Sequence, residues 1–192
     1  MARYKVEQKE QTRENIIAAA GRCFKKSGYS GIGVDGLAKE AGCTSGAFYG
    51  HFESKQSAFA AAIIAGVNQL EVGIKHFQNE YGTEWWIEFA KFYMNQKRTC
   101  DLTESCPLQS LTPEIGRSDE AIRGIFETEL LKVIQLATEG ASPEANQSAN
   151  EKTWVNLAML VGGVTLARAV KDEALSNEIG LAIQNAIYKN QK

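Results

Sequence analysis

Apolar residues recur at intervals of three and four along nearly the whole chain, which is the pattern of amphipathic helices. Only three prolines occur among the 192 residues, and no segment shows the alternation of a half-buried strand. The pattern therefore predicts an all-α protein, without an internal repeat or a low-complexity linker.

The first expected helix covers about residues 10–27. Its apolar face includes Ile16, Ala20 and Phe24, and Gly28 stands where a left-handed residue closes many helices. This segment predicts one regular helix that ends at a glycine.

Two short helices should follow, over about residues 34–41 and 45–51. Gly42 permits a sharp turn between them, the Thr44 hydroxyl can cap the second helix, and Phe48 returns an apolar anchor to the core. Two short helices joined by a tight, glycine-containing turn describe a helix-turn-helix. The alternative on spacing alone is a plain helical hairpin within a bundle.

Longer helices are expected in the rest of the chain, bounded by capping residues and by glycine and proline breaks. An aromatic-rich helix should follow Tyr81-Gly82-Thr83, and residues 99–118 should hold loops around one short helix. The other expected helices cover about residues 54–76, where Ser54 can cap the start, 118–139, which Ser118-Asp119 opens, 143–170 and 176–189.

Charge is distributed unevenly along the chain, although the net charge is only -2. Residues 1–55 hold nine Lys and Arg against six Asp and Glu, whereas the remainder holds twelve against seventeen. Only the first part is suited to binding phosphate groups.

Membrane insertion and secretion are not expected. No apolar run approaches the roughly 20 residues that span a bilayer, because charged residues interrupt each candidate: Lys75, Lys91, Arg98, Arg168 and Lys171. The first fourteen residues are polar and do not resemble a signal peptide. A cytoplasmic location follows.

Catalytic and metal-binding motifs are also missing from the pattern. The four cysteines form no CxxC pair, only two histidines are present, and no glycine-rich phosphate loop, GxSxG or HExxH occurs. We expect no enzymatic activity, no metal and no cofactor. A helical protein-interaction module remains the alternative to a DNA-binding protein.

The segment from Thr12 to Phe59 carries a specific set of residues in register: Arg13, Phe24, Gly28, Tyr29, Leu37-Ala38, Ala41-Gly42, Phe48-Tyr49, His51-Phe52 and Ser54-Lys55. This set resembles the N-terminal DNA-binding region of the TetR family. The resemblance implies a DNA-binding domain over 1–55 and a helical effector-binding and dimerisation domain over 56–192. It also implies a homodimeric transcriptional repressor that binds a pseudo-palindromic double-stranded operator and is released by a small-molecule or electrophilic effector.

The resemblance assigns six residues to DNA contact: Thr44, Ser45, Gly46, Tyr49, His51 and Lys55. The first three lie at the N-terminus of the recognition helix, where free amides favour phosphate and side chains reach base edges. The others would contact phosphates. Alternatively, His51 caps or stacks beside Tyr49, and Lys55 is a solvated surface charge.

Two positions depart from the family pattern. Gly33 replaces a frequent threonine and Gly50 a larger polar residue, so fewer side-chain contacts are available there. An N-terminal arm bearing Arg3, Lys5 and Lys9 is expected to compensate along the DNA backbone or in a minor groove.

The last two helices are expected to form a two-fold symmetric four-helix interface with a second copy. Large apolar residues such as Leu160 and Val164 alternate there with small ones such as Gly162 and Gly163, which let helices approach closely. Burial within the same subunit is the alternative.

An effector pocket is expected among aromatic residues of the second half: Trp85, Trp86, Phe89, Tyr93 and Phe126. The alternative is that they form core. Because adjacent helical positions point about 100° apart, one of the two tryptophans should face a cavity or the surface.

Cys106 is the candidate for a reactive sensor. It precedes Pro107 at an expected helix start, where the dipole and free amides should lower the thiol pKa. The surrounding segment is similar to a Gly-Cys-x4-Leu element in a branch of the family, some of whose members respond to electrophiles or oxidants. The alternative is a small packed residue.

Overall fold

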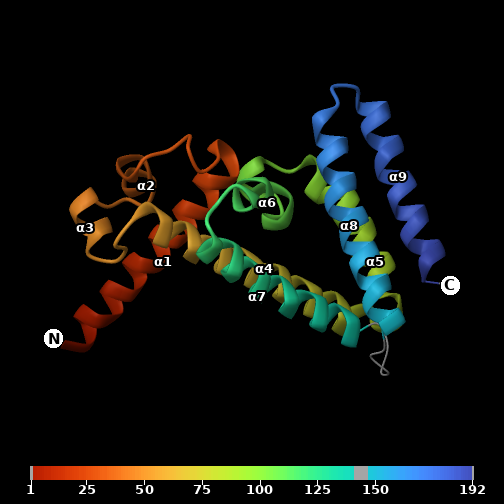
Figure 1. The fold of residues 1–192 in the computed structure, drawn as a ribbon, viewed down its shortest axis with the longest axis horizontal. Coiled ribbons are helices and arrows are strands. Elements are labelled where there is room, and N and C mark those ends of the chain that lie inside the picture. The colour runs from red at the N-terminus through yellow and green to blue at the C-terminus, as the bar shows by residue number, and fades with distance from the viewer. Residues whose placement is uncertain (1, 141–146, 192) are drawn as a thin grey trace.

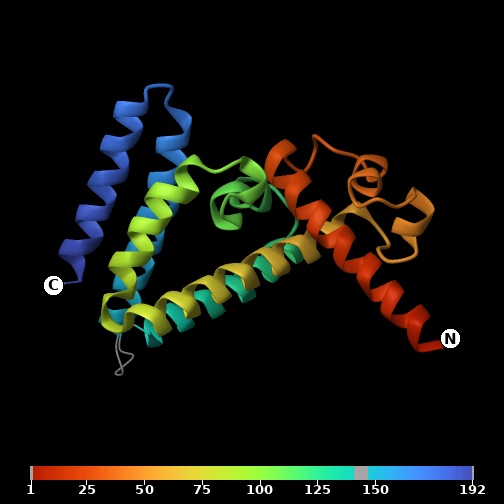
Figure 2. The same cartoon turned by 180° about the vertical axis from the view of Figure 1, so that it is seen from behind.

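The computed structural model describes the backbone of residues 2–140 and 147–191, and all regular structure in these ranges is helical (Figure 1). The helices form an elongated molecule with the chain's N-terminal part at one end and its last two helices at the other (Figures 1 and 2). The all-α prediction is confirmed.

The N-terminal head comprises α1 (Ala2–Ser27), α2 (Val34–Glu40) and α3 (Ser45–Tyr49) with their loops. Gly28 and Gly42 both have positive φ, 71° and 69°, as turns after helices require. Both glycines are in the roles that the sequence predicts.

Two details of the head differ from the prediction. Helix α1 begins at Ala2 rather than near residue 10, so Arg3, Lys5 and Lys9 belong to a helix and not to an extended arm. Helix α3 ends at Tyr49, since Gly50 already forms its C-cap. Helix α3 itself therefore offers only five residues, Ser45–Tyr49, for contact with DNA.

Two long helices connect the head to the rest of the molecule. Helix α4 (Lys55–Tyr81) runs away from the head with α7 (Glu120–Glu139) packed beside it (Figure 1). Ser54 caps α4 by accepting from the Ser57 amide, and Asp119 caps α7 by accepting from the Ile122 amide. Both helix starts were predicted, whereas α4 extends five residues beyond the expected end.

The aromatic segment after α4 is broken into short elements. A 3₁₀ turn η1 (Gly82–Glu84) leads into α5 (Trp85–Phe92), which continues as a π-helical turn η2 (Tyr93–Lys97). A second 3₁₀ turn, η3 (Leu102–Glu104), precedes α6 (Pro107–Gly116). The irregular segment expected over 99–118 thus contains one short helix.

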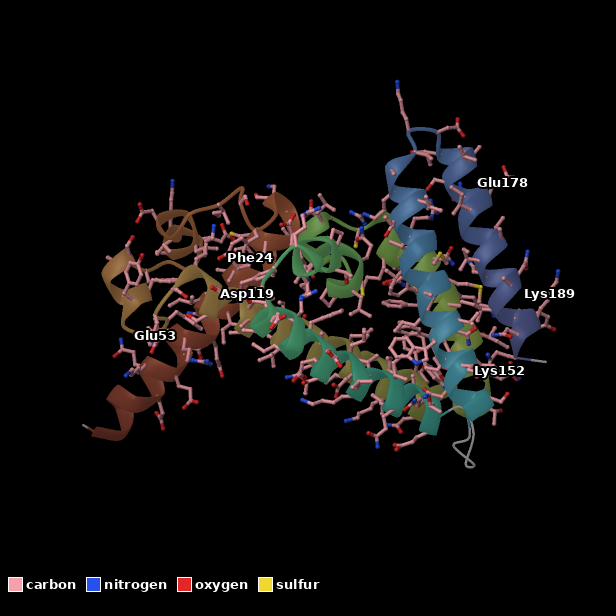
Figure 3. All side chains as sticks on the ribbon, viewed as in Figure 1. Phe24, Glu53, Asp119, Lys152, Glu178 and Lys189 are labelled. Atoms are coloured by element: carbon pink, nitrogen blue, oxygen red, sulfur yellow. The ribbon has the colours of Figure 1, made fainter. Side chains whose placement is uncertain are left out.

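Helices α8 (Gln147–Ala169) and α9 (Glu173–Asn190) pack against each other at the end opposite the head (Figure 2). Glu53 in the head and Glu178 and Lys189 on α9 mark the two ends (Figure 3). The expected start of α8 at Pro143 lies outside the described residues. Helix α9 begins three residues earlier than expected, because Asp172 caps it through the Leu175 amide.

One helical stretch among the described residues, 55–97, is long and apolar enough by length and composition to cross a membrane, contrary to the sequence expectation. It is not one straight helix, since η1 and Gly82 with φ of 52° separate α4 from α5. Side chains such as Phe59 and Ile74 pack into the protein core, which accounts for the apolar composition.

Candidate DNA-binding surface and effector pocket

Helices α2 and α3 form a helix-turn-helix. Leu37 and Ala38 on α2 and Phe48 on α3 are fully buried, and the Phe48 ring contacts Phe52 with centroids 5.7 Å apart. These apolar anchors hold α3 in place while its N-terminal turn stays on the surface.

The first turn of α3 is fixed by two side-chain hydrogen bonds. Thr44 accepts from the Ala47 amide at 3.1 Å, and the Ser45 hydroxyl donates to Asp35 on α2 at 2.5 Å. Gly46 is exposed. The amides of Ser45 and Gly46 lie in the first turn, where no intrahelical acceptor exists, so they are available to an anion.

Tyr49 and His51 lie on the exposed side of the same unit. Tyr49 is 58% exposed, with its ring edge against Phe48 at a centroid distance of 5.6 Å. His51 is half-buried in the turn after α3, and its amide donates to the Phe48 carbonyl at 2.9 Å. The Tyr49 ring is therefore held against Phe48, while its side chain is exposed enough for the hydroxyl to reach a ligand.

Lys55 is engaged inside the head. Its Nζ donates to the carbonyls of Tyr29 and Ile32, at 2.9 and 3.0 Å, and lies 4.2 Å from the centre of the Tyr29 ring. It thus fastens the loop between α1 and α2 to the start of α4 and is not a solvated surface charge. Any phosphate contact would compete with these bonds.

The aromatic residues expected to form one pocket occupy three different places. Trp85 and Trp86 are both buried, with stacked rings 4.3 Å apart. Neither ring faces the surface, because α5 is covered by α4 and also by α9, so the expectation of a surface position is wrong. Phe126 lines a separate apolar groove between α7 and α8, which also contains Leu130 and Trp154.

The remaining candidates meet at a cavity of about 240 Å³, which we call the junction pocket. Phe89, Tyr93 and Cys106, three of the residues expected at an effector site, all line it. Lys25 of α1 and Lys97 of η2 also line it, and the sequence pattern singled out neither. Lys25 directly follows the buried Phe24, and nothing in helical periodicity distinguishes a lysine at a pocket from one in solvent.

Cys106 is the N-cap of α6 and Pro107 is at its first position, as predicted. The thiol is only 3% exposed. Burial raises the pKa of Cys106, although the nearby Tyr93 hydroxyl, the amides of Gln109 and Leu108, and Lys25 act in the opposite direction. The expected lowering of this pKa is wrong, because desolvation outweighs the effect of the helix start.

The expected position of Gly163 in a contact with a second copy is also wrong. A Cβ at Gly163 would lie 2.6 Å from Ile183 Cγ1 and 3.2 Å from Met94 Cε, so this glycine permits close packing within the subunit. Gly162 is exposed, with nothing within 4 Å of its Cβ position. Gly162 therefore lies on the solvent-exposed face of α8, whereas Gly163 lies on its buried face.

Large apolar side chains remain exposed on the last two helices. Leu166 on α8 is 62% exposed and Leu181 on α9 is 59% exposed, and Val155, Leu175 and Tyr188 are also at least two-fifths exposed. Within the described ranges, no three His, Cys, Asp or Glu side chains gather as metal ligands would.

The comparisons with known proteins agree with this geometry. The family model described as "Bacterial regulatory proteins, tetR family" matches residues 16–62, which include the helix-turn-helix. The transcriptional regulator SrpR of Pseudomonas putida is 38% identical over 72 residues. That match covers 38% of this chain and 34% of SrpR, so it spans about a third of the relative.

Two further likenesses extend over most of the chain. A TetR-family regulator from Cytophaga hutchinsonii has the same fold, with a TM-score of 0.75 at 20% identity, over 95% of this chain and 96% of that one. The transcriptional regulator LmrA of Bacillus subtilis is 36% identical over 170 residues, which are 84% of this chain and 88% of LmrA. These relatives are transcriptional regulators and not enzymes. The protein belongs to the TetR family of bacterial regulatory proteins.

Proposed function

We propose that the protein is a transcriptional repressor that binds a pseudo-palindromic operator as a homodimer and leaves it when a small molecule occupies the junction pocket. The observation that carries this proposal is the helix-turn-helix itself, whose buried side is anchored by Phe48 while the first turn of α3 stays exposed. A recognition helix reads bases with its N-terminal residues in this orientation.

Six residues form the proposed DNA contact. The amides of Ser45 and Gly46 and the Thr44 hydroxyl lie at the positive end of α3, where a phosphate or a base edge is favoured. Tyr49 and His51 are close enough in sequence to donate to neighbouring phosphates. Lys55 supports the site chiefly by holding the loop between α1 and α2, and its charge adds to the field of the head.

The charge distribution supports the same assignment. The proposed DNA-binding domain, 1–55, has three more basic than acidic residues, whereas 56–192 has five more acidic than basic ones. Opposite signs in the two parts direct the head toward DNA and keep the other end away from it. Operator binding in a bacterium places the protein in the cytoplasm.

The exposed apolar faces of α8 and α9 are the proposed homodimer interface. Leu166, Leu181 and Tyr188 would be buried when the same faces of two subunits meet around a two-fold axis. Because these helices lie at the end opposite the head (Figure 1), pairing them leaves both heads free. Two recognition helices about 34–36 Å apart match successive major grooves.

Selection of duplexes from a random pool, followed by a mobility-shift titration, tests the proposal. We expect a sequence with two-fold symmetry to be enriched and its affinity to fall steeply with salt, because phosphate contacts release counterions. The selected operator should bind two chains. A pool that shows no enrichment over random duplexes would contradict the repressor proposal and favour a helical interaction module.

A further inference from the structure

The junction pocket is lined by two lysines, Lys25 and Lys97, and by one carboxylate, Glu104, which forms no ion pair with either lysine among the described residues. Lys25 Nζ donates to the Thr103 carbonyl at 3.3 Å, and Lys97 Nζ donates to the Glu104 carbonyl at 2.8 Å. Neither lysine takes part in an ion pair found among the described residues. Both lysines therefore line the cavity, and the hydrogen-bond acceptors of their ammonium groups are backbone carbonyls.

The environment of Lys25 is unfavourable for its charge. Burial lowers the pKa of Lys25, and the charge of Lys97 acts in the same direction, whereas Cys106, Glu104 and Cys100 oppose the change. The Glu104 side chain is exposed and forms no ion pair found here with Lys25. A bound anion would offset the desolvation cost of the charged Lys25 ammonium group, which no ion pair offsets among the described residues.

Tyr93 adds an unsatisfied polar group to the same cavity. Its side chain is only 2% exposed, and its hydroxyl has only the adjacent Cys106 thiol, a weak acceptor, as a partner in the described part of the chain, with no nitrogen or oxygen in hydrogen-bond geometry. A buried hydroxyl without a strong acceptor is unfavourable, because it has lost its hydrogen bonds to water. An oxygen of a ligand would satisfy this group.

The rest of the cavity is apolar, since Leu70, Phe89, Phe92 and Pro107 contribute to its lining. A cavity of about 150 Å³ holds benzene. The junction pocket, at about 240 Å³, has room for one ring or a short alkyl chain and a carboxyl group.

We propose that the effector is a small apolar carboxylic acid, bound as its anion, with the carboxylate between Lys25 and Lys97 and the hydrocarbon against Phe89 and Leu70. The Tyr93 hydroxyl donates to a carboxylate oxygen. This assignment names the ligand class for the effector site of the proposed function. The effect of the acid on operator binding rests on the proposed repressor function, whereas the binding of the acid to the pocket does not.

The position of Lys25 connects the ligand to the head. Lys25 is on α1, the helix whose buried residues Ile16, Ala20 and Phe24 join the core beneath the helix-turn-helix. A carboxylate that takes the Lys25 ammonium from the Thr103 carbonyl changes a direct bond between α1 and the segment before α6. The acid thus acts on α1, and also on α4, which contributes Leu70 to the same pocket.

Binding is measured by thermal shift and calorimetry with four acids, benzoate, phenylacetate, trans-cinnamate and octanoate, each against its primary amide. We expect at least one acid to bind about tenfold or more tightly than its amide, which corresponds to about 1.4 kcal/mol. Lys25→Met and Lys97→Met should each remove most of this preference, and Tyr93→Phe should weaken it. Lys26→Met, at an exposed position of the same helix, is the matched control and should behave as wild type.

The outcomes separate this inference from the proposed repressor function. If none of the four acids binds more tightly than its amide, or if folded Lys25→Met keeps the preference, the carboxylate site is refuted. Operator binding without any acid is assayed in parallel by mobility shift. If the wild-type protein does not bind operator DNA, the repressor proposal is refuted, but the preference for acid over amide can still be measured.

Discussion

The head and the remainder of the chain differ in how far their polar contacts reach along the sequence. In the head, Thr44 binds Ala47 three residues away and Ser45 binds Asp35 ten residues away. In the remainder, Arg98 donates to Ser176 at 2.8 Å across 78 positions, and Arg168 donates to the Lys97 carbonyl across 71. The recognition unit is specified locally, whereas the pocket depends on contacts between distant segments.

Few side-chain hydrogen bonds join these two parts among the described residues. Lys25 on α1 donates to the Thr103 carbonyl, and Lys55 at the start of α4 donates to the carbonyls of Tyr29 and Ile32. The other connection is α4, which begins at the head and continues along the pocket. A change in the pocket can therefore reach the head by a small number of identifiable routes.

The largest effect is expected from a charge placed in the close contact between α8 and α9. Gly163→Glu would put a carboxylate against Ile183 and Met94, and an unpaired buried charge costs about 3–5 kcal/mol. Urea denaturation should show a loss of this size or an unfolded protein.

The neighbouring substitution Gly162→Glu is the matched control, because nothing lies within 4 Å of that Cβ position. The subunit should keep its stability, while sedimentation should show a weakened dimer if the exposed face of α8 is the interface. Equal destabilisation by both substitutions would mean that the two faces of α8 are not distinct.

The next largest effect is expected at Lys55. Lys55→Met removes two charge-assisted bonds and a contact with the Tyr29 ring, and hydrogen bonds to charged groups contribute about 1.5–3 kcal/mol. The free energy of unfolding should fall by about 2 kcal/mol. Lys39→Met, at an exposed position of α2, should change it little. An unchanged stability for Lys55→Met would return this lysine to a direct phosphate contact.

A smaller effect, on affinity and not on stability, is expected at the exposed phenol of α3. Tyr49→Phe should weaken operator binding by about 0.5–1.5 kcal/mol, the value of one hydrogen bond, and leave the urea midpoint unchanged because the hydroxyl is in solvent. Tyr81→Phe, at the far end of α4, is the control and should retain full affinity. Equal affinities for wild type and Tyr49→Phe in a mobility-shift titration would remove Tyr49 from the contact.

What the sequence predicts correctly is mostly what neighbouring residues decide. The caps at Thr44, Ser54 and Asp119 and the left-handed turns at Gly28 and Gly42 each depend on a few adjacent positions, and all are observed. Their physical rules act over one helical turn.

What the sequence does not predict depends on which distant elements meet. The burial of both Trp85 and Trp86 requires α9 as well as α4 beside α5. The inward position of Gly163 requires Ile183 from α9. Lys25 becomes a pocket residue only because the segment before α6 folds back onto α1. Hydrophobic periodicity predicts which face of a helix is buried, but it does not predict which other element packs against that face.

The smallest effect is expected at Cys106, where local and distant influences oppose each other. The helix start favours the thiolate, but burial by distant segments raises the thiol pKa, so at pH 7.5 the group is almost entirely protonated. N-ethylmaleimide should therefore label Cys106 in the folded protein much more slowly than Cys100, which is only half-buried. The rate at Cys106 should keep rising as pH increases past the ordinary thiol value of about 8.5, because only then does the thiolate accumulate. Mass spectrometric mapping after timed quenching separates the two sites, and Cys106→Ser confirms the assignment.

If Cys106 is labelled as fast as Cys100 at pH 7.5, the pocket opens readily in solution. An electrophile switch at this cysteine would then be the better account of induction than a carboxylate bound to Lys25.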